Sequence, residues 1–255
     1  MNAELELVTD SGTQHWVFPA SFAQQRLWFL EQLEGAGPVW NVRLPVRLTG
    51  TLDIAALEQA VAAVVARHEA LRTTLQMRGG DILQVVASAL TVPVERVALP
   101  EATEDELRTR LGELCSGTFD LREGPLLRVF LVELAPADHV LLILSHHCVS
   151  DAWSSGVLFR DLAASYTALT RGRPPLLPAL PIQYADFAVW QRDWLAGPEL
   201  ERQAAYWREH LKNAPVLLDL PVDRPRPRLQ SYRGHRLGHG LPAELTAQLK
   251  SLAVT

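Results

Sequence analysis

The chain has 255 residues, of which 48% are hydrophobic and 21% are charged, so it carries enough apolar side chains for a sizeable core. This balance excludes global disorder, and two cysteines are too few for a disulfide scaffold of this length. The formal net charge of -5, from 24 basic and 29 acidic side chains, argues against a dedicated nucleic-acid-binding protein.

The N-terminus and the hydropathy pattern indicate in which compartment the protein lies. No apolar run reaches the ~18 residues typical of a membrane-spanning helix, so we expect no membrane partner. The first residues, MNAELELVTDSG, are acidic and polar, unlike a secretory signal. Together with the scarce cysteines, these features predict a cytoplasmic protein.

Helices and strands are predicted to alternate through the first two thirds of the chain. Helix starts are marked by N-cap residues, namely Ser21 with Gln24, Asp53, and Thr103 with Glu106. In chain order we expect a helix at 22–33, a strand at 42–48, a helix at 54–75 with His68 on its apolar face, strands at 82–86 and 92–97, a helix at 103–116, strands at 126–134 and 139–145, and a helix ending near 170. This order predicts a mixed α/β fold, with the apolar strand 139–145 covered on both faces.

A Pro-rich segment, RGRPPLLPAL at residues 171–180, is the best candidate for a domain boundary. After it we expect helices at 184–195 and 199–211, an extended stretch at 221–227, a strand at 235–241 and a helix at 243–253. The chain therefore divides into a mixed α/β domain and the opening of a second structural region.

The most informative motif is His146-His147-x-x-x-Asp151, at the end of the buried strand. Side chains alternate across a strand, so one imidazole can face a cavity while the other serves the core. A neutral imidazole accepts a proton near neutral pH, because histidine titrates at about pH 6.5. Asp151 either orients the ring or anchors the loop by pairing with an arginine.

The residues alone allow two other interpretations of the histidine pair. Two histidines and a carboxylate can ligate zinc or iron, but ligands on opposite faces of a strand cannot share a metal unless the strand breaks. We therefore expect no metal. The other interpretation is that the two histidines are adjacent by chance and have no catalytic role.

Four segments resemble, in order, core motifs of the condensation domains of nonribosomal peptide synthetases. They are SFAQQRLWFL from Ser21, RHEALRT from Arg67, SHHCVSDAWS from Ser145 and YADFAVW from Tyr184. The resemblance begins at about Trp16, and its details are most similar to the subtype that joins an L-configured donor to an L-configured acceptor. The family's usual glycine after the motif aspartate is Ala152 here, and the family's later motifs are absent.

The resemblance implies a fold of two chloramphenicol-acetyltransferase-like lobes with the active site in a tunnel between them. On this template, residues 1–175 form the N-terminal lobe with the active-site motif. Residues 176–255 form a connector and the truncated start of the C-terminal lobe.

The resemblance also implies an activity and its partners. Condensation domains join an upstream carrier-bound acyl or peptidyl thioester to the amine of a downstream carrier-bound aminoacyl thioester. Both substrates travel on 4'-phosphopantetheine arms of peptidyl carrier proteins, so no directly bound cofactor is expected. An adjacent adenylation domain and the missing C-terminal lobe are the other implied partners.

Residue roles follow from the same resemblance. His147 is implied as general base or as a positioning group for the amine, and His146 as a structural histidine beneath it. Asp151 is implied as an anchor, and Arg67 is its candidate partner in this chain. Trp153, Ser154 and Arg26 are candidate tunnel residues, and Ser154 is also the expected N-cap of the following helix.

Two rival functions remain. One is an acyltransferase that uses the same motif with a CoA thioester. The other is a non-catalytic structural lobe, because half a tunnel cannot hold two tethered reactants. We expect the isolated chain to be folded over its first ~175 residues, to have little condensation activity, and to be open to self-association through the uncovered face.

Overall fold

The computed structural model describes residues 6–10, 13–35, 37–228, 230, 232, 234 and 237–253. The chain falls into two compact units, residues 1–212 and residues 213–255. The second unit contains one regular element among its described residues, the helix α7 (Ala243–Leu252), as predicted. The strand predicted at 235–241 lies partly outside the described residues, and its described part, 237–241, has no regular secondary structure.

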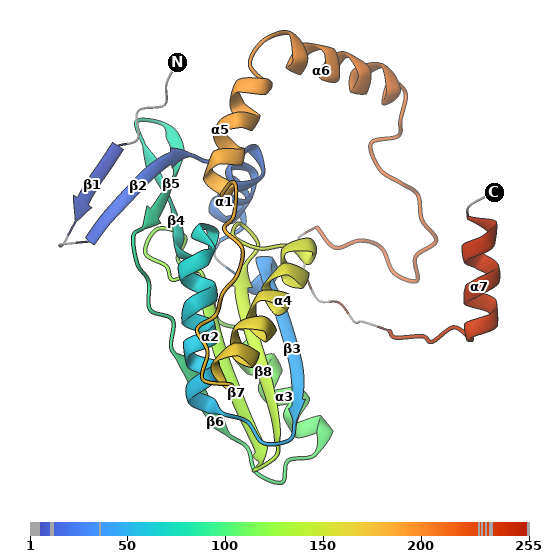
Figure 1. Cartoon of the computed structure of the whole chain (residues 1–255). Helices are drawn as coiled ribbons and strands as arrows, with labels where there is room; N and C mark the ends of the chain where they lie inside the picture. The colour runs from blue at the N-terminus through green and yellow to red at the C-terminus, as the bar shows by residue number, and fades with distance from the viewer. Residues whose placement is uncertain are drawn as a thin grey trace. The chain divides into compact units, whose positions relative to one another are not determined.

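Two four-stranded sheets form the frame of the first unit (Figure 1). One sheet is antiparallel, in the order β1 (Glu6–Asp10), β2 (Thr13–Pro19), β5 (Asp81–Ala87) and β4 (Thr73–Arg78). The other has the order β3 (Asn41–Thr49), β8 (Asp138–His146), β7 (Leu127–Ala135) and β6 (Val94–Ala98), with β6 parallel to β7 and the other pairs antiparallel. The predicted mixed α/β class is confirmed.

Six α-helices and two short 3₁₀ turns, η1 and η2, complete the described part of this unit. They are α1 (Phe22–Glu34), η1 (Pro38–Trp40), α2 (Ile54–Arg67), η2 (Glu69–Arg72), α3 (Glu104–Leu114), α4 (Ala152–Leu169), α5 (Tyr184–Trp194) and α6 (Pro198–His210). The capping boxes predicted at Ser21 and Thr103 are both present, and Asp53 caps α2. Each cap satisfies a backbone N–H that the first helical turn leaves without a partner.

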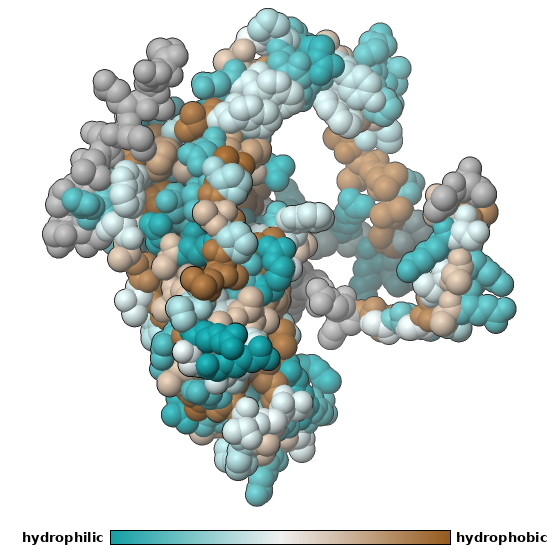
Figure 2. Space-filling view, viewed as in Figure 1, coloured by the Kyte–Doolittle hydropathy of each residue, from teal (hydrophilic) through white to brown (hydrophobic). Residues whose placement is uncertain are grey.

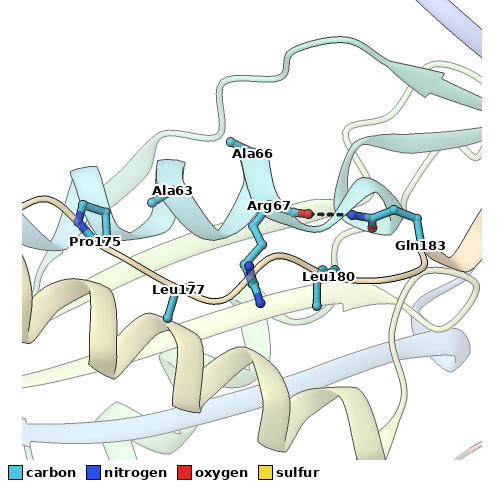
Figure 3. A pocket seen from close by; sticks show the side chains of 7 residues that line it. All are labelled: Ala63, Ala66, Arg67, Pro175, Leu177, Leu180 and Gln183. Carbon is cyan, nitrogen blue, oxygen red and sulfur yellow. Dashed lines mark hydrogen bonds between the residues drawn. The ribbon is translucent and has the colours of Figure 1, made fainter.

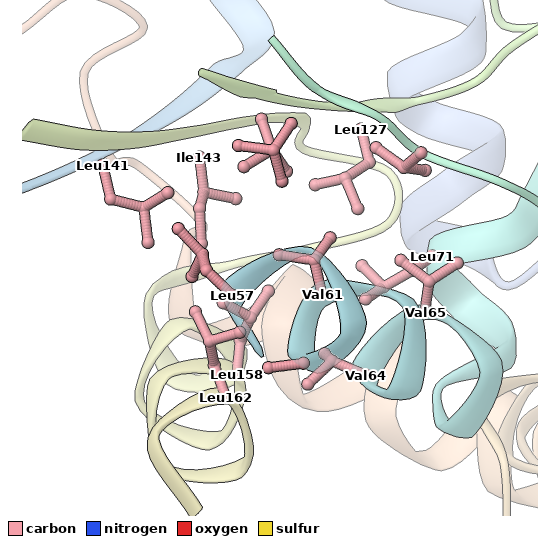
Figure 4. Close-up of a cluster of buried hydrophobic side chains, with 14 of the residues drawn as sticks. Leu57, Val61, Val64, Val65, Leu71, Leu127, Leu141, Ile143, Leu158 and Leu162 are labelled. Carbon is pink, nitrogen blue, oxygen red and sulfur yellow. The ribbon is translucent and has the colours of Figure 1, made fainter. Parts of the chain in front are cut away.

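Helices α2 and α4 cover one face of the sheet that contains β8. Leu141 and Ile143 of β8 point toward Val61 of α2 and toward Leu158 and Leu162 of α4 (Figure 4). On the opposite face, β8 and β7 pack against α1, α3 and the segment between α3 and β7, through Leu27, Trp28, Leu107, Phe119, Phe130, Val132, Val140, Leu142 and Leu144. Strand β8 is therefore covered on both faces, as its apolar sequence predicts.

The end of α2 differs from the prediction. The helix was expected to continue to about Leu75, but it ends at Arg67, and Leu75 lies fully buried in β4. Strand β4 pairs with β5 across the Gly79-Gly80 turn, where both glycines have positive φ. Ladder pairing with a neighbouring strand overrides the helical spacing here. Strand β2, for which the sequence pattern predicts no element, pairs with β5 on the other side.

Large apolar side chains are exposed in both units. Trp190 and Trp194 of α5 stack with ring centroids 5.3 Å apart and are about half exposed, and Trp207 of α6 is similarly exposed. In the second unit, Val216 and Leu237 are almost fully exposed. Figure 2 accordingly shows hydrophobic residues among the hydrophilic ones on the surface.

Candidate active site

The histidine motif lies where β8 ends and the chain turns into α4. Three main-chain hydrogen bonds fix the backbone of this turn, two of them to neighbouring segments. The His146 N–H donates to the Leu126 carbonyl at 3.0 Å, and the His147 N–H donates to the Trp40 carbonyl at 2.8 Å. The Val149 N–H closes the turn onto the His146 carbonyl at 3.0 Å. The backbone of the loop is therefore held by main-chain hydrogen bonds.

The His147 side chain is solvent-accessible, and its tautomer follows from its partner. Its Nδ1 lies 2.8 Å from the Ser150 carbonyl oxygen. Because a carbonyl oxygen only accepts, Nδ1 carries the hydrogen, and Nε2 of the neutral ring is left as an acceptor. Ser150 itself is held by a 2.6 Å hydrogen bond between its hydroxyl and that of Ser145. The site thus presents a preorientated proton acceptor at the surface of the loop.

His146 occupies the opposite environment and is fully buried. Its Nδ1 accepts a hydrogen bond from the Cys148 backbone N–H at 3.2 Å, and its Nε2 lies 2.8 Å from Glu31 Oε2 of α1. The Phe119 ring meets it edge-on, with centroids 6.3 Å apart. Burial, together with the Glu31 charge, strongly raises the pKa of the neighbouring Cys148 thiol. The two imidazoles therefore separate as strand alternation predicts, with His146 in the core.

Asp151 is the N-cap of α4. Its carboxylate accepts the Ser154 N–H at 2.7 Å, and its own N–H donates to the Ser154 hydroxyl at 2.6 Å. The hydrogen bond from the Ser154 backbone lowers the pKa of this carboxyl. The prediction of Ser154 as N-cap is wrong, because the extended backbone that precedes the helix is at Asp151 and Ser154 stands one turn inside.

Ala152, which replaces the family's usual glycine, is the first residue of α4. A helical backbone has negative φ and accommodates alanine without strain. The substitution therefore leaves the turn into the helix intact, and the capping box described above forms around it.

Arg67 does not pair with Asp151, so that prediction is wrong. Its Nε lies 3.0 Å from Oδ2 of Asp161 on α4, and His68 Nε2 lies 2.9 Å from the same oxygen. Asp161 is only 3% exposed, and although burial raises the pKa of its carboxyl, the hydrogen bonds from His68 and Arg67 bring it below the ordinary value. The tight packing of α2 on α4 places these groups together.

Asp161 was not singled out from the sequence, although a signal was present. It falls on the buried face of α4 together with Leu158, Leu162 and Ser165. An acidic residue on the apolar face of a helix requires a partner, because an unpaired buried charge is costly.

Two pockets adjoin the motif residues. A small one of about 70 Å³ lies beside the His146–Ser154 loop and is lined by Leu44, His68, Ala70, Leu71, Val149, Ser150, Ser154, Ser155, Val157 and Leu158. A larger, open one of about 370 Å³ separates α2 from the Pro-rich connector, with Ala63, Ala66 and Arg67 on one side and Pro175, Leu177, Leu180 and Gln183 on the other (Figure 3). No residue of the His146–Ser154 loop lines the larger pocket.

The remaining candidate residues lie at the surface. Trp153 is 85% exposed at the start of α4, and Arg26 lies on the exposed side of α1. Neither lines the two pockets described above. Within the described residues, no group of three or more His, Cys, Asp or Glu side chains is arranged to hold a metal ion. Across the same part of the chain, no helix is long and apolar enough to cross a membrane.

Known proteins share both the sequence and the fold of this chain. Residues 14–255 match the family model of the condensation domain. A linear gramicidin synthase of Brevibacillus parabrevis is 46% identical over 239 residues, covering 92% of this chain and 3% of that protein. Phosphinothricin tripeptide synthetase PhsC of Streptomyces viridochromogenes is 45% identical over 239 residues, covering 92% of this chain and 22% of that protein. The chain spans a small part of the length of these relatives.

Solved structures show the same likeness. The X-domain from teicoplanin biosynthesis is 36% identical, with a TM-score of 0.75, over 90% of this chain and 50% of that chain. The first condensation domain of the CDA synthetase has a TM-score of 0.70 at 21% identity, over 78% of this chain and 51% of that chain.

Proposed function

This chain belongs to the condensation-domain family, and we propose that it is the N-terminal part of a domain that forms amide bonds in a nonribosomal peptide synthetase. The likeness to solved condensation domains confirms the predicted chloramphenicol-acetyltransferase-like fold. The observation that carries the proposal is the His147 imidazole, whose Nε2 is left as an acceptor at the end of a buried strand. We also propose the lobe division made from the sequence, with residues 1–175 as the N-terminal lobe and 176–255 as connector and start of the second.

In the proposed reaction, the amine of the acceptor attacks the thioester carbonyl of the donor. A C–N bond forms, the carbon–sulfur bond breaks, and the amine proton passes by way of His147 Nε2 to the departing thiolate. A positioned base contributes about 10²–10⁴-fold to such a step. Holding the two tethered reactants together contributes further, because it replaces an encounter in solution.

The other motif residues support the loop in this proposal. His146 anchors the end of β8 through its contact with Glu31, and Asp151 fixes the start of α4. Trp153 and Arg26 stay candidates for the tunnel wall, because both side chains are accessible. Ser154 is assigned to the capping box instead, because it makes both bonds with Asp151.

The proposed substrates and partners follow from the relatives, which carry the names of peptide synthetases. We propose upstream and downstream peptidyl carrier domains that present substrates on 4'-phosphopantetheine, with an adenylation domain nearby. The solved X-domain chain is about twice as long as the part this chain covers, which supports a second lobe outside the 255 residues. The exposed Trp190, Trp194 and Trp207 are consistent with surface that the complete protein covers.

The experiment offers the same donor group to the full-length synthetase on a carrier protein and on CoA, with the acceptor on its carrier. Product on the acceptor carrier is followed by mass spectrometry of the intact protein. We expect transfer only from the carrier-bound donor, and little product from the isolated 255-residue chain. Efficient transfer from CoA without carrier dependence would instead support the CoA-dependent acyltransferase. Product at the full rate from the isolated chain would contradict the lobe assignment.

A further inference from the structure

A buried carboxylate outside the histidine motif joins α4 to the second sequence motif. Asp161 is 3% exposed and contacts three basic side chains: Arg67 Nε at 3.0 Å, His68 Nε2 at 2.9 Å and Arg160 Nε at 3.3 Å. The first two also have little exposure, whereas the Arg160 side chain is 70% exposed. Charge-assisted bonds of this kind gain strength where water is excluded. Asp161 therefore holds Arg67 and His68 more firmly than it holds Arg160.

The backbone of the same corner is fixed independently from the other side. The Gln183 side chain accepts the Glu69 N–H at 3.2 Å. It also donates to the Arg67 carbonyl at 3.0 Å (Figure 3). Gln183 therefore secures the main chain where α2 ends and η2 begins. Both of these hydrogen bonds are to main-chain atoms, so the direction of the Arg67 and His68 side chains depends on Asp161.

The His68 side chain leads from this corner to the catalytic loop. His68 lines the small pocket together with Val149 and Ser150 of the loop. The Ser150 carbonyl is the group that accepts the His147 Nδ1–H and so sets the tautomer of that ring. Asp161 therefore contacts His68, His68 and Ser150 line the same small pocket, and Ser150 contacts His147.

We propose that Asp161 is a positioning residue of the active site. It fixes the Arg67 and His68 side chains, and these support the Val149–Ser150 segment, which in turn holds His147. The expected loss of kcat rests on the proposed function. The expected change in the His147 tautomer concerns the isolated chain and does not depend on that function. On this proposal, the role of Arg67 and His68 in the second motif is to support the loop.

The test compares Asp161→Asn with Arg160→Gln. Asparagine keeps the volume of Asp161 and removes its charge, whereas Arg160→Gln removes the exposed ion pair to the same carboxylate and leaves the buried contacts in place. In the full-length synthetase, we expect Asp161→Asn to lower kcat by roughly 10- to 100-fold, because a small displacement of a reacting group is costly. The KM values for both carriers should stay within about twofold, and Arg160→Gln should match the wild type.

A spectroscopic measurement on the isolated chain removes the dependence on activity. Nitrogen-15 NMR of the imidazole rings should show His147 with its hydrogen on Nδ1 in the wild type and in Arg160→Gln. Asp161→Asn should give a mixture of the two tautomers, at unchanged helix and strand content. A loss of kcat with this tautomer change supports the proposal. Unchanged kcat, or an unchanged His147 tautomer in the folded variant, would overturn it.

A second variant covers the case in which Asp161→Asn does not fold. His68→Gln leaves the Arg67–Asp161 pair in place and removes the link to the pocket wall. It should reproduce both the kcat loss and the tautomer change, and a wild-type result for either would overturn the proposal. If the wild-type synthetase forms no amide at all, the proposed function fails, whereas the NMR comparison still decides the role of Asp161.

Discussion

Removing Glu31 should destabilise the protein more than breaking an exposed ion pair. The Glu31 and His146 side chains are 4% and 1% exposed, with Oε2 and Nε2 2.8 Å apart. Glu31→Ala leaves His146 buried with no anionic partner at Nε2. Leaving a buried polar group without a polar neighbour costs about 1–3 kcal/mol, because the remaining group keeps its desolvation penalty. Glu31→Gln, which keeps the size and an acceptor oxygen, should cost less than Glu31→Ala.

Urea unfolding of the isolated chain, followed by circular dichroism, measures the effect. For a slope of about 2 kcal/mol per molar urea, a loss of about 1–3 kcal/mol lowers the midpoint by roughly 0.5–1.5 M. Arg108→Ala is the matched control, because it breaks the exposed Asp105–Arg108 pair on α3, and its midpoint should equal that of the wild type. The double variant Glu31→Ala/His146→Ala should lose less stability than the sum of the two single variants.

Two results would refute this reasoning. One is a Glu31→Ala midpoint that equals the Arg108→Ala midpoint. The other is strict additivity of the Glu31 and His146 substitutions, since contacting residues in a buried pair are expected to be energetically coupled. Either result would mean that His146 is held by the surrounding core and the Cys148 backbone, and that Glu31 is dispensable for it.

Three further outcomes are expected of the same chain. Asp151→Ala should cost about 1 kcal/mol in urea unfolding through loss of the α4 cap, whereas Asp151→Asn should cost little, and equal midpoints for wild type and alanine variant would contradict the capping role. The folded state holds the pKa of Asp151 and Asp161 below the ordinary value of 3.8, so the stability they contribute is present above that value and is lost as the pH falls through the lower, folded-state pKa. Urea midpoints compared at about pH 7 and about pH 3 should show a loss that is smaller in Asp161→Asn, and an equal loss would contradict this assignment. Burial raises the pKa of the Cys115 and Cys148 thiols, so neither should react with a thiol reagent at about pH 8 until urea unfolds the chain, and rapid native labelling would contradict their burial.

Locally encoded features of the fold could be predicted from the sequence. The capping boxes at Ser21 and Thr103 involve residues three apart, and both form as predicted. The apolar run of β8 indicated cover on both faces, which α2 and α4 supply on one side and α1 and α3 on the other. In both cases the signal that allows the prediction lies within a few neighbouring residues, although the helices that cover β8 come from other parts of the chain.

Features that depend on distant partners could not be predicted. The end of α2 and the start of β4 are decided by pairing with β5, which helical periodicity does not report. The partner of Arg67 was assigned to Asp151, but Asp161 lies 94 positions away on the face of α4 that packs on α2. Asp151 caps α4 and Asp161 lies within it. Only the packing of α4 against α2 shows which of the two aspartates contacts Arg67.

The candidate site was predictable in its residue types and less so in its contacts. The motif indicated that His146 and His147 would face opposite environments, which the structure bears out. It did not reveal that Ser150 holds His147, or that Glu31 contacts His146, because these partners are recognisable only in three dimensions.

The central claim is that His147 acts on the amine during amide formation, and single-turnover product formation tests it most directly. Both carriers of the full-length synthetase are loaded, and product is quantified by mass spectrometry for the wild type, His147→Ala and His210→Ala. The last variant removes an exposed histidine on α6, far along the chain from the loop. We predict a rate roughly 10²–10⁴-fold lower for His147→Ala and an unchanged rate for His210→Ala. A His147→Ala rate equal to that of the wild type, with both carriers loaded, would contradict the account.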